Sequence, residues 1–371
     1  MKLMITVPWG RRLGGAETML FGFLRCVDRD RVDVEVVFFE DGWFVEEVAL
    51  LGLRTHVLTA GRLRQLRSGV AVVRALARLL EQERPDLLLN WMPKTHLYGA
   101  AAAVLARRAD RVVWWQHTVP RPDWLDRLAT LLPTRAIGCS SNRSAAAQSM
   151  LRPARRVFVV HPGVEVPVLS SDADRRALRD ELAIPRGRSL VGMVGRLEPG
   201  KRHDRFLDVV NALRVRGLDV HGLMVGGPLP GSSRDAVSSL GNEVRRRSLT
   251  DVVTLTGPVA DARPLIELMD VVVSVASVEA FGIALVEAMA FGIPVVAIAA
   301  GGPEEIIESG ASGILVPPNV DEIADAVQRI LTDDRLRRRL STGARGRFLS
   351  TFTAPRMARD IEAAMAELCA T

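Results

Sequence analysis

Short apolar runs alternate with longer amphipathic stretches along nearly the whole chain. The runs are KLMITV, VDVEVVFF, RTHVL, DLLLNW, RVVWWQH, TRAIGCS and RVFVVHPG, then SLVGMVG, VHGLMVG, DVVTLTG, VVVSVA, IPVVAIA and GILVPP. The stretches between them have helical periodicity, as at residues 16–27 and 68–82. Buried strands separated by helices of about 10–15 residues are typical of parallel sheets with helices on both faces. The pattern predicts an α/β protein.

The expected strands are too many for one sheet of this type, so we expect two Rossmann-like domains. A length of 371 residues agrees with two domains of roughly 100–200 residues each. The break is expected within residues 163–188, which contain prolines and charges but no continuous strand pattern. We predict an N-terminal domain over residues 1–165, a C-terminal domain over residues 166–350 and a final helix within residues 351–371.

Ligands of such sheets bind beyond the carboxyl ends of the strands, where loops lead into helices. The first of these loops, VPWGRRLGGAET, places Gly14 and Gly15 before a helix with Glu17 in its first turn. Glycines let a ligand approach the N–H groups of a helix N-terminus, and a tight turn with a helix cap is the alternative. The glycines do not form G-x-G-x-x-G, so a nicotinamide-dependent dehydrogenase lacks its fingerprint, although Glu40 could mimic its ribose-binding acid.

Two further strand ends in the N-terminal half carry histidines. His117 in WWQHT follows the strand expected near the centre of the sheet. Lys94 and His96 in NWMPKTH follow another strand and are candidates for the acceptor side of a site. A structural role in the core is the alternative for a single histidine, and it stays open at this point.

The C-terminal half has a basic turn after its first strand. The segment MVGRLEPGKRHD presents Arg196 and Lys201 on either side of a Pro-Gly turn before a helix. Two cations at this spacing beside a glycine turn are suited to bind a pyrophosphate. A solvated basic loop is the alternative.

Two glutamates interrupt the apolar segment SVEAFGIALVEAMAFGIPVVA. Glu279 lies in the loop after a strand, and Glu287 lies on the helix that begins near Gly282. Carboxylates are seldom buried without partners, because removing the charge from water costs on the order of several kcal/mol. The N–H groups at the start of the helix point to the same place. A ligand with sugar hydroxyls would compensate the burial of both carboxylates.

Composition narrows the class of partner. The net charge is +6 and the pI is about 10.0, which favours anionic ligands. Aromatic residues make up 5% of the chain, and no helix-turn-helix or finger motif is present, so nucleic acid is not expected. The three cysteines lack metal-ligand spacing, which favours a reduced, cytoplasmic protein. No apolar run approaches the roughly 18 residues of a membrane span.

These motifs, in this order, resemble a known family. GRLEPGKR followed by EAFGIALVE looks like the retaining GT-B glycosyltransferases with the E-x7-E signature, which are family 4-like. The resemblance runs along the whole chain through GGAE, WWQHT, VVHPGVE, VTLTGPV and GGPEEIIESGASGILVPP. One departure is Pro162, which stands where the family has an asparagine before the interdomain glycine.

The resemblance implies the GT-B fold, with two Rossmann-like domains whose parallel sheets face across a cleft, and a C-terminal helix that crosses back to the N-terminal domain. The cleft is expected to close on the donor. The residues implied for catalysis are His117, Arg196, Lys201 and Glu279. Those implied for binding the donor are Gly14, Gly15, Gly257, Phe281, Gly282, Ile283, Leu285, Val286 and Glu287. The acceptor side is assigned to residues 14–17, residues 91–96 and Trp114 onward, with Glu17, Lys94 and His96 as candidates.

Each implied role has a chemical reason. Arg196 and Lys201 would neutralise the diphosphate of a nucleotide sugar, UDP-linked by the resemblance, with help from the N–H groups of Leu285 and Val286. Glu287 would hold the ribose, while Glu279 and the N–H groups of residues 281–283 would contact sugar hydroxyls. Gly257 would lie beside the base, and His117 near the sugar.

The family transfers the sugar with retention, and the sequence offers no separate nucleophile. No cofactor is expected, because the nucleotide sugar is a co-substrate. No metal is expected either: DRD at residues 28–30 and DAD at residues 172–174 match D-x-D by letters, but neither follows a buried strand. The rival functions are a GT-B nucleotide-sugar 2-epimerase and a non-catalytic sugar-nucleotide-binding protein.

The acceptor is an unidentified hydroxyl of a small molecule, a glycan or a lipid-linked sugar. One helix raises the question of a peripheral contact with the inner face of the membrane. Its expected apolar stripe is Val70, Val73, Ala77 and Leu80, and the arginines around it are Arg62, Arg64, Arg67, Arg74 and Arg78. An ordinary Rossmann helix with a charged outer face is the alternative.

Overall fold

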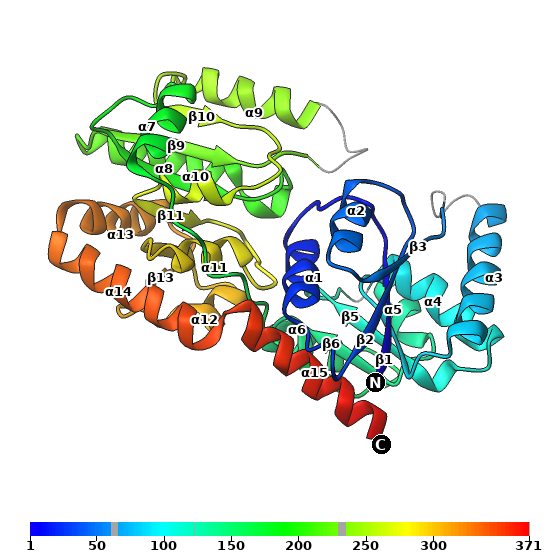
Figure 1. The fold of residues 1–371 in the computed structure, drawn as a ribbon. Helices are drawn as coiled ribbons and strands as arrows, with labels where there is room; N and C mark the ends of the chain where they lie inside the picture. Colours follow the sequence, from blue (N-terminus) through cyan, green and yellow to red (C-terminus); the bar gives the residue numbers. More distant parts are fainter. Residues whose placement is uncertain (61–65, 122, 229–234, 371) are drawn as a thin grey trace. The chain divides into compact units, whose positions relative to one another are not determined.

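The computed structural model describes residues 1–60, 66–121, 123–228 and 235–370, and the side chains of residues 66, 67, 235 and 236 lie outside that description. The chain divides into two compact units (Figure 1). The N-terminal unit comprises Met1–Pro162 together with Ala354–Thr371, and the C-terminal unit comprises Gly163–Thr353.

The N-terminal unit contains a seven-stranded sheet in the order β3-β2-β1-β4-β5-β6-β7, with every pairing parallel. Its strands are β1 (Lys2–Val7), β2 (Asp33–Phe38), β3 (Arg54–Val57), β4 (Leu87–Asn90), β5 (Val112–Gln116), β6 (Ala136–Cys139) and β7 (Val157–Val159). Its helices are α1 (Gly15–Cys26), α2 (Trp43–Leu50), α3 (Leu66–Glu83), α4 (Pro93–Leu105), η1 (Ala109–Arg111), α5 (Trp124–Leu131), α6 (Asn142–Ser149) and α15 (Ala354–Ala370).

The C-terminal unit contains a six-stranded parallel sheet in the order β10-β9-β8-β11-β12-β13. Its strands are β8 (Ser189–Val194), β9 (Val220–Val225), β10 (Val253–Leu255), β11 (Val271–Ser274), β12 (Val295–Ile298) and β13 (Ile314–Val316). Its helices are α7 (Asp172–Glu181), η2 (Pro199–Lys201), α8 (His203–Val215), α9 (Asp235–Arg246), α10 (Arg263–Glu267), α11 (Ile283–Ala290), α12 (Gly302–Ile306), α13 (Val320–Thr332) and α14 (Asp334–Thr351).

All the strands expected from the apolar runs are present, and the predicted α/β architecture is confirmed. The runs are continuously apolar because helices cover both faces of each sheet, so successive side chains on both sides are buried. In β5 all five residues are buried, including Trp114 and Trp115. Truncating a tryptophan in such a core to alanine typically costs about 3–5 kcal/mol.

The last helix belongs to the N-terminal unit. Helix α15 packs against α1, and the carboxylate of Glu362 accepts a hydrogen bond of 2.9 Å from the N–H of Asp28. Glu362 is buried, so this bond ties the segment that follows α1 to α15 away from solvent. The chain therefore leaves the N-terminal unit after Pro162 and returns to it at Ala354.

Helix α3 carries the stripe that raised the membrane question. Ala77 and Leu80 are buried in the core of the N-terminal unit, whereas Val70 is 49% exposed. This arrangement fits a helix that covers a sheet with its inner half. The arginines Arg62 and Arg64 and the side chain of Arg67 lie outside the described residues. Among the described residues, no helix is long and apolar enough to cross a membrane.

Candidate functional site

The loops after β8 and β11 meet at the carboxyl edge of the C-terminal sheet. These strands are neighbours and parallel, so the segments that follow them lie side by side. The N–H of Ser277 donates to the carbonyl of Gly200 at 3.0 Å, which ties the two loops together. The hydrogen bond brings the basic turn predicted from GRLEPGKR next to the EAFG segment.

Lys201 and Glu279 form an ion pair across these loops. The Nζ of Lys201 lies 2.5 Å from Oε2 of Glu279, and the two side chains are 23% and 14% exposed. A pair with so little solvent is screened less than a surface pair, and removing one partner leaves the other charge poorly compensated. Of the cations and carboxylates predicted for the site, these two are brought into direct contact.

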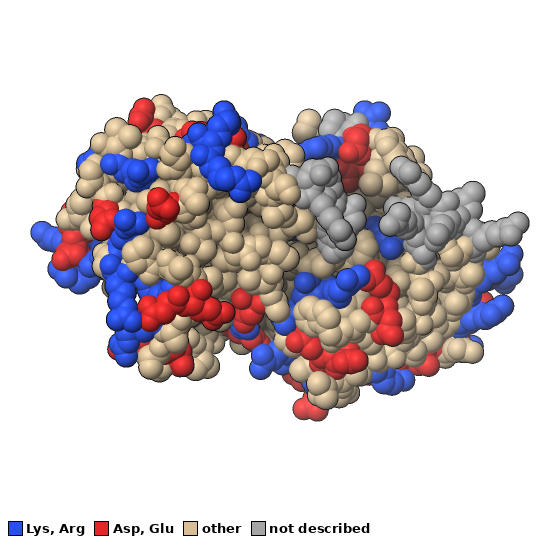
Figure 2. Space-filling view, turned by 90° about the horizontal axis from the view of Figure 1, so that it is seen from above, with Lys and Arg blue, Asp and Glu red and all other residues tan. Residues whose placement is uncertain are grey.

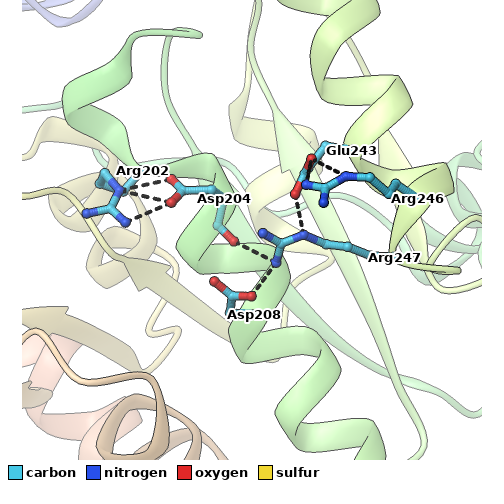
Figure 3. Close-up of polar contacts among 6 residues, drawn as sticks. All are labelled: Arg202, Asp204, Asp208, Glu243, Arg246 and Arg247. Atoms are coloured by element: carbon cyan, nitrogen blue, oxygen red, sulfur yellow. Dashed lines mark hydrogen bonds and ion pairs between the residues drawn. The ribbon is translucent and has the colours of Figure 1, made fainter.

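Arg196 and Arg202, the other cations of the turn, have partners of their own. Arg196 lies 3.3 Å from Glu198 and its side chain is 41% exposed. Arg202 binds both carboxylate oxygens of Asp204, at 2.7 to 3.1 Å (Figure 3). Arg202 is therefore engaged by Asp204, whereas the Arg196 side chain remains partly exposed.

A network between α8 and α9 shows where other arginines are used. Arg247 pairs with Asp208 and Glu243, and it also donates to the carbonyl of Asp204 at 3.2 Å (Figure 3). On the face drawn in Figure 2, basic and acidic side chains are interspersed. On this face the net charge of +6 therefore does not form one continuous basic surface.

The segment GGPEE holds the Glu279 loop in place. The N–H of Glu279 donates to Ala300 O at 3.0 Å, and the N–H of Gly302 donates to Glu279 O at 2.9 Å. A Cβ on Gly302 would overlap the carbonyl oxygen of Phe281, so only glycine allows this approach. Gly301 has a φ of 99°. The Glu304 carboxylate accepts its N–H at 2.9 Å, which satisfies the N-cap N–H of α12.

Helix α11 begins at this loop. Gly282 is its N-cap, with a φ of 113° that favours glycine. The N–H groups of Leu285 and Val286 donate to Gly282 O at 2.9 and 3.4 Å. The sequence predicts that these two N–H groups bind a diphosphate. To donate to it, they must share or give up their hydrogen bond with Gly282 O. The side chain of Phe281 is buried and packs edge-on against Phe352. Only the backbone of Phe281 is therefore left at the loop surface.

Glu287 is half-buried on α11, one turn beyond the first residue, Ile283. Burial raises the pKa of its carboxyl to about 7, the negative charge of Asp261 adds to the rise, and Arg263 opposes it. Arg263 pairs with Asp261 at 2.7 Å. Glu287 is therefore close to half ionised at neutral pH, and a group that donates hydrogen bonds to it would favour its charged form.

Glycines pack closely at the ends of β8, β9 and β10. Gly226 has a φ of 133°, and a Cβ there would overlap the carbonyl of Gly195. Gly257 has a φ of 71°, and its carbonyl accepts a bond of 3.2 Å from the N–H of Gly226. A small pocket lies against this cluster, and apolar side chains line much of it: Leu197, Met224, Val237, Leu240 and Leu255. Gly257 thus lies beside an apolar pocket.

In the N-terminal unit, His117 follows β5 and is half-buried. Its ring centroid lies 4.9 Å from that of Trp91, and its Nδ1 lies 3.4 Å from Ser140 Oγ. Burial lowers the pKa of His117 to about 3, against a smaller opposing effect of a backbone hydrogen bond with Trp91, so the ring is neutral at pH 7. Ser140 Oγ also accepts a hydrogen bond from Trp115 Nε1 at 3.3 Å, which fixes the hydroxyl beside the His117 ring.

His96 does not line the acceptor side, and that prediction is wrong. It is fully buried and stacked on Trp114, with ring centroids 4.9 Å apart. Its Nε2 lies 3.1 Å from Ala129 O, and burial lowers its pKa to about 3. The reason is helical geometry: the His96 side chain lies on the sheet side of α4, two positions away from Lys94. Trp91 and Trp114 are likewise core residues.

The other residues predicted for the N-terminal loops have mixed positions. Gly14 is the N-cap of α1, whose Thr18 N–H donates to Gly14 O at 3.2 Å, and Gly15 is the first residue of the helix. Glu17 is buried, at 2% exposure, against the prediction that it lines the acceptor side. Lys94 is half-buried, with its Nζ 4.8 Å from the centroid of the Trp9 ring.

The two D-x-D segments are turn and helix-end features. Asp28 accepts from the N–H of Asp30 at 3.0 Å, and Asp172 pairs with Arg175 in the first turn of α7. In the described part of the chain, no group of three or more His, Cys, Asp or Glu side chains is arranged to hold a metal ion.

Two family models cover most of the sequence. The model of "Glycosyl transferases group 1" matches residues 174–347, and that of "Glycosyltransferase Family 4" matches residues 13–167. Both matches fall on the Rossmann-like units described above. A glycosyltransferase from Rickettsia africae, 16% identical, shares the fold, with a TM-score of 0.81 over 99% of this chain and 98% of that one. The two halves of the chain thus match two glycosyltransferase families, and the fold is that of the GT-B glycosyltransferases.

Similar proteins give this GT-B glycosyltransferase its context. A D-inositol 3-phosphate glycosyltransferase of Mycobacterium tuberculosis is 35% identical over 200 residues, which cover 53% of this chain and 38% of that protein. The match thus spans well under half the length of such curated relatives. Anabaena Alr3699/HepE in complex with UDP and glucose is 27% identical, with a TM-score of 0.86 over 99% of this chain and 100% of that one. Its complex with UDP-glucose is 26% identical, with a TM-score of 0.85 over 99% and 100%.

Sequence reasoning assigned no role to several residues that shape the site of this GT-B glycosyltransferase. Ser140 orients His117, and its signal was a polar residue at the end of the strand next to β5. Asp261 and Arg263 modify the pKa of Glu287, which burial raises, and the signal was a charged pair after the turn that follows β10. Gly302 was quoted only as part of a family motif, and its close approach to Phe281 is a matter of tertiary packing.

Proposed function

We propose that this GT-B glycosyltransferase transfers a hexose from a UDP-sugar to a hydroxyl acceptor, with retention at the anomeric carbon and without a metal. The observation that carries the proposal is the Lys201–Glu279 ion pair at the carboxyl edge of the C-terminal sheet. The similar structures that contain UDP, glucose or UDP-glucose make UDP-glucose the first donor to test.

The pair suits a donor because its two halves complement different parts of one molecule. A diphosphate entering beside Arg196 and Lys201 would take over the ammonium that Glu279 now holds. The carboxylate would then be available to accept hydrogen bonds from hydroxyls of the sugar. Cations fixed at the leaving phosphate act more strongly on the transition state than on the bound donor, because charge develops there as the bond breaks.

Retention follows if the acceptor attacks on the face from which the diphosphate leaves. The bond between the anomeric carbon and the phosphate oxygen breaks, and the bond to the acceptor oxygen forms on the same side. The acceptor proton passes to the departing phosphate oxygen, and UDP is released. This route uses no enzyme nucleophile, which agrees with Glu279 being bound to Lys201.

Glu287 and His117 complete the proposal. Glu287 would accept hydrogen bonds from the ribose diol in its ionised form, so donor affinity should rise with pH through about 7. His117, neutral at pH 7, would form a hydrogen bond with the sugar or the acceptor and does not act there as a cation.

The test is a thermal-shift series with UDP, GDP, ADP, TDP and their sugars, with and without EDTA. We expect stabilisation by UDP and UDP-glucose that EDTA does not change. The anomeric configuration of the product, read by proton NMR, tests retention. Stabilisation by no nucleotide would refute the donor assignment, an inverted product would refute the mechanism, and loss of activity with EDTA would refute metal independence.

A further inference from the structure

Lysine is rare in this chain and occurs only at positions 2, 94 and 201. Lys2 lies 2.9 Å from Glu35 and 2.5 Å from Glu83, and Lys201 is paired with Glu279. Lys94 differs from both. Within the described residues no carboxylate lies at ion-pair distance from it, and its Nζ contacts the face of Trp9.

Lys94 occupies the edge of the sheet where a ligand binds in this architecture. Trp9 follows β1, Lys94 follows β4 and His117 follows β5. Strands β1, β4 and β5 are adjacent and parallel, so their carboxyl ends share one edge of the N-terminal sheet. The lysine thus lies on the same edge as the histidine proposed to face the reacting sugar.

The surroundings of Lys94 leave its charge incompletely compensated. Burial lowers the pKa of Lys94, and Glu40 opposes this only as a more distant charge. Glu40 is itself paired with Arg11 at 2.6 Å, and the neighbouring Arg12 is paired with Glu47 at 3.2 Å. A contact with an aromatic face replaces only part of the hydration that an ammonium loses. An anion arriving there would supply the missing partner.

We infer that Lys94 binds an anionic group, a phosphate or a carboxylate, carried by the acceptor. The inference rests on the proposed function, because it assigns a chemical class to the acceptor of that reaction. The indole of Trp9 would hold the ammonium from the other side and give the acceptor an apolar surface to pack against. If Lys94 only fixed the Trp9 loop, its substitution would affect charged and neutral acceptors alike.

The experiment compares matched acceptors with UDP-glucose as donor. The pairs are myo-inositol with D-inositol 3-phosphate, glucose with glucose 6-phosphate, and glucose with glucuronate. We expect the anionic member of at least one pair to have the higher kcat/KM, by about tenfold or more. Lys94→Gln should raise the KM for that acceptor about tenfold or more, and Lys94→Arg should recover part of the loss.

Arg107→Gln is the matched control. It removes one positive charge just beyond the other end of α4, where Arg107 is exposed. It should leave the KM for the anionic acceptor and the KM for its neutral counterpart within about twofold of the wild-type values. Retained stabilisation of Lys94→Gln by UDP would show that the variant is folded. Equal use of neutral and anionic acceptors, or an equal loss on both with Lys94→Gln, would overturn the inference alone. Failure of UDP-glucose to bind or react would overturn the proposed function and the inference with it.

Discussion

Glu287 offers a prediction that separates stability from function. The pKa of its carboxyl is about 7 in the folded protein and 4.5 ordinarily. Because the folded value is the higher one, the stability that the proton contributes is present below pH 4.5 and is lost as the pH rises to 7. At pH 8 the ionised carboxylate should therefore destabilise the ligand-free C-terminal unit.

The size of the effect follows from the two pKa values. One pKa unit corresponds to about 1.4 kcal/mol, so the ionised carboxylate costs the folded unit about 3 kcal/mol at pH 8 and about 1 kcal/mol at pH 5. Glu287→Gln keeps the shape and removes the charge. We expect it to raise the melting temperature by roughly 6–12 °C at pH 8 and by only about 2–4 °C at pH 5, since 1 kcal/mol shifts a unit of this size by about 2–4 °C.

The assay is thermal unfolding of wild type and variant at the two pH values, with and without UDP. The transition that UDP shifts in the wild type identifies the C-terminal unit, which matters because a protein of two units need not melt in one step. The same substitution should weaken stabilisation by UDP, since an amide accepts hydrogen bonds from the ribose diol less strongly than a carboxylate does.

Glu322→Gln, on the exposed first turn of α13, is the control and should change stability by less than about 0.5 kcal/mol at either pH. A stability gain from Glu287→Gln that is equal at pH 5 and pH 8 would refute the argument from burial and ionisation. A loss of stability at pH 8 would refute it as well.

The remaining predictions concern the ion pair, the loop that carries it and the buried histidine. Lys201→Met should lower kcat by about 100-fold or more, because the leaving diphosphate loses a fixed cation, and steady-state kinetics with UDP-glucose would check this. Glu279→Gln should reduce kcat/KM for the donor while the melting temperature stays within a few degrees, as a rough limit; an unchanged kcat/KM would contradict its proposed contact with the sugar. Gly302→Ala should displace the Glu279 loop, lower the free energy of unfolding in urea by about 1–3 kcal/mol and abolish UDP binding. Unaltered UDP binding would contradict the steric argument. His96→Ala should cost about 2–4 kcal/mol in urea unfolding without changing the pH dependence of kcat, as expected of a core residue.

The strands could be predicted from the sequence because burial on both faces leaves an apolar run that needs no tertiary information. The contact between Lys201 and Glu279 was within reach for a related reason: both follow strands of one parallel sheet, so their loops share an edge. The positions of Lys94 and His96 could not be predicted from the sequence. They are two residues apart at a helix start, and which of them turns to the core depends on the rotation of α4 about its axis.

The residues that modify the site could not be predicted from the sequence, because they act through contacts that form only in the folded protein. Asp261 and Arg263 lie more than twenty residues before Glu287 in the chain, and only the packing of the α10 region against α11 makes them neighbours in electrostatic terms. Ser140 contacts His117 from the adjacent strand β6, across a register that the sequence alone does not define.

The return of the chain at Ala354 has a consequence for synthesis and for engineering. Because α15 completes the N-terminal unit, that unit cannot finish folding until α15 itself has left the ribosome, whereas residues 163–353 are available earlier as one contiguous stretch. The two ends of that stretch are paired: Val164 N–H donates to Phe352 O at 2.9 Å, beside a parallel bridge between Val164 and Thr353. The C-terminal unit is thus an insertion with adjoining ends, which can be expressed alone as one uninterrupted segment, while the N-terminal unit requires Pro162 to be joined to Ala354 by a short linker.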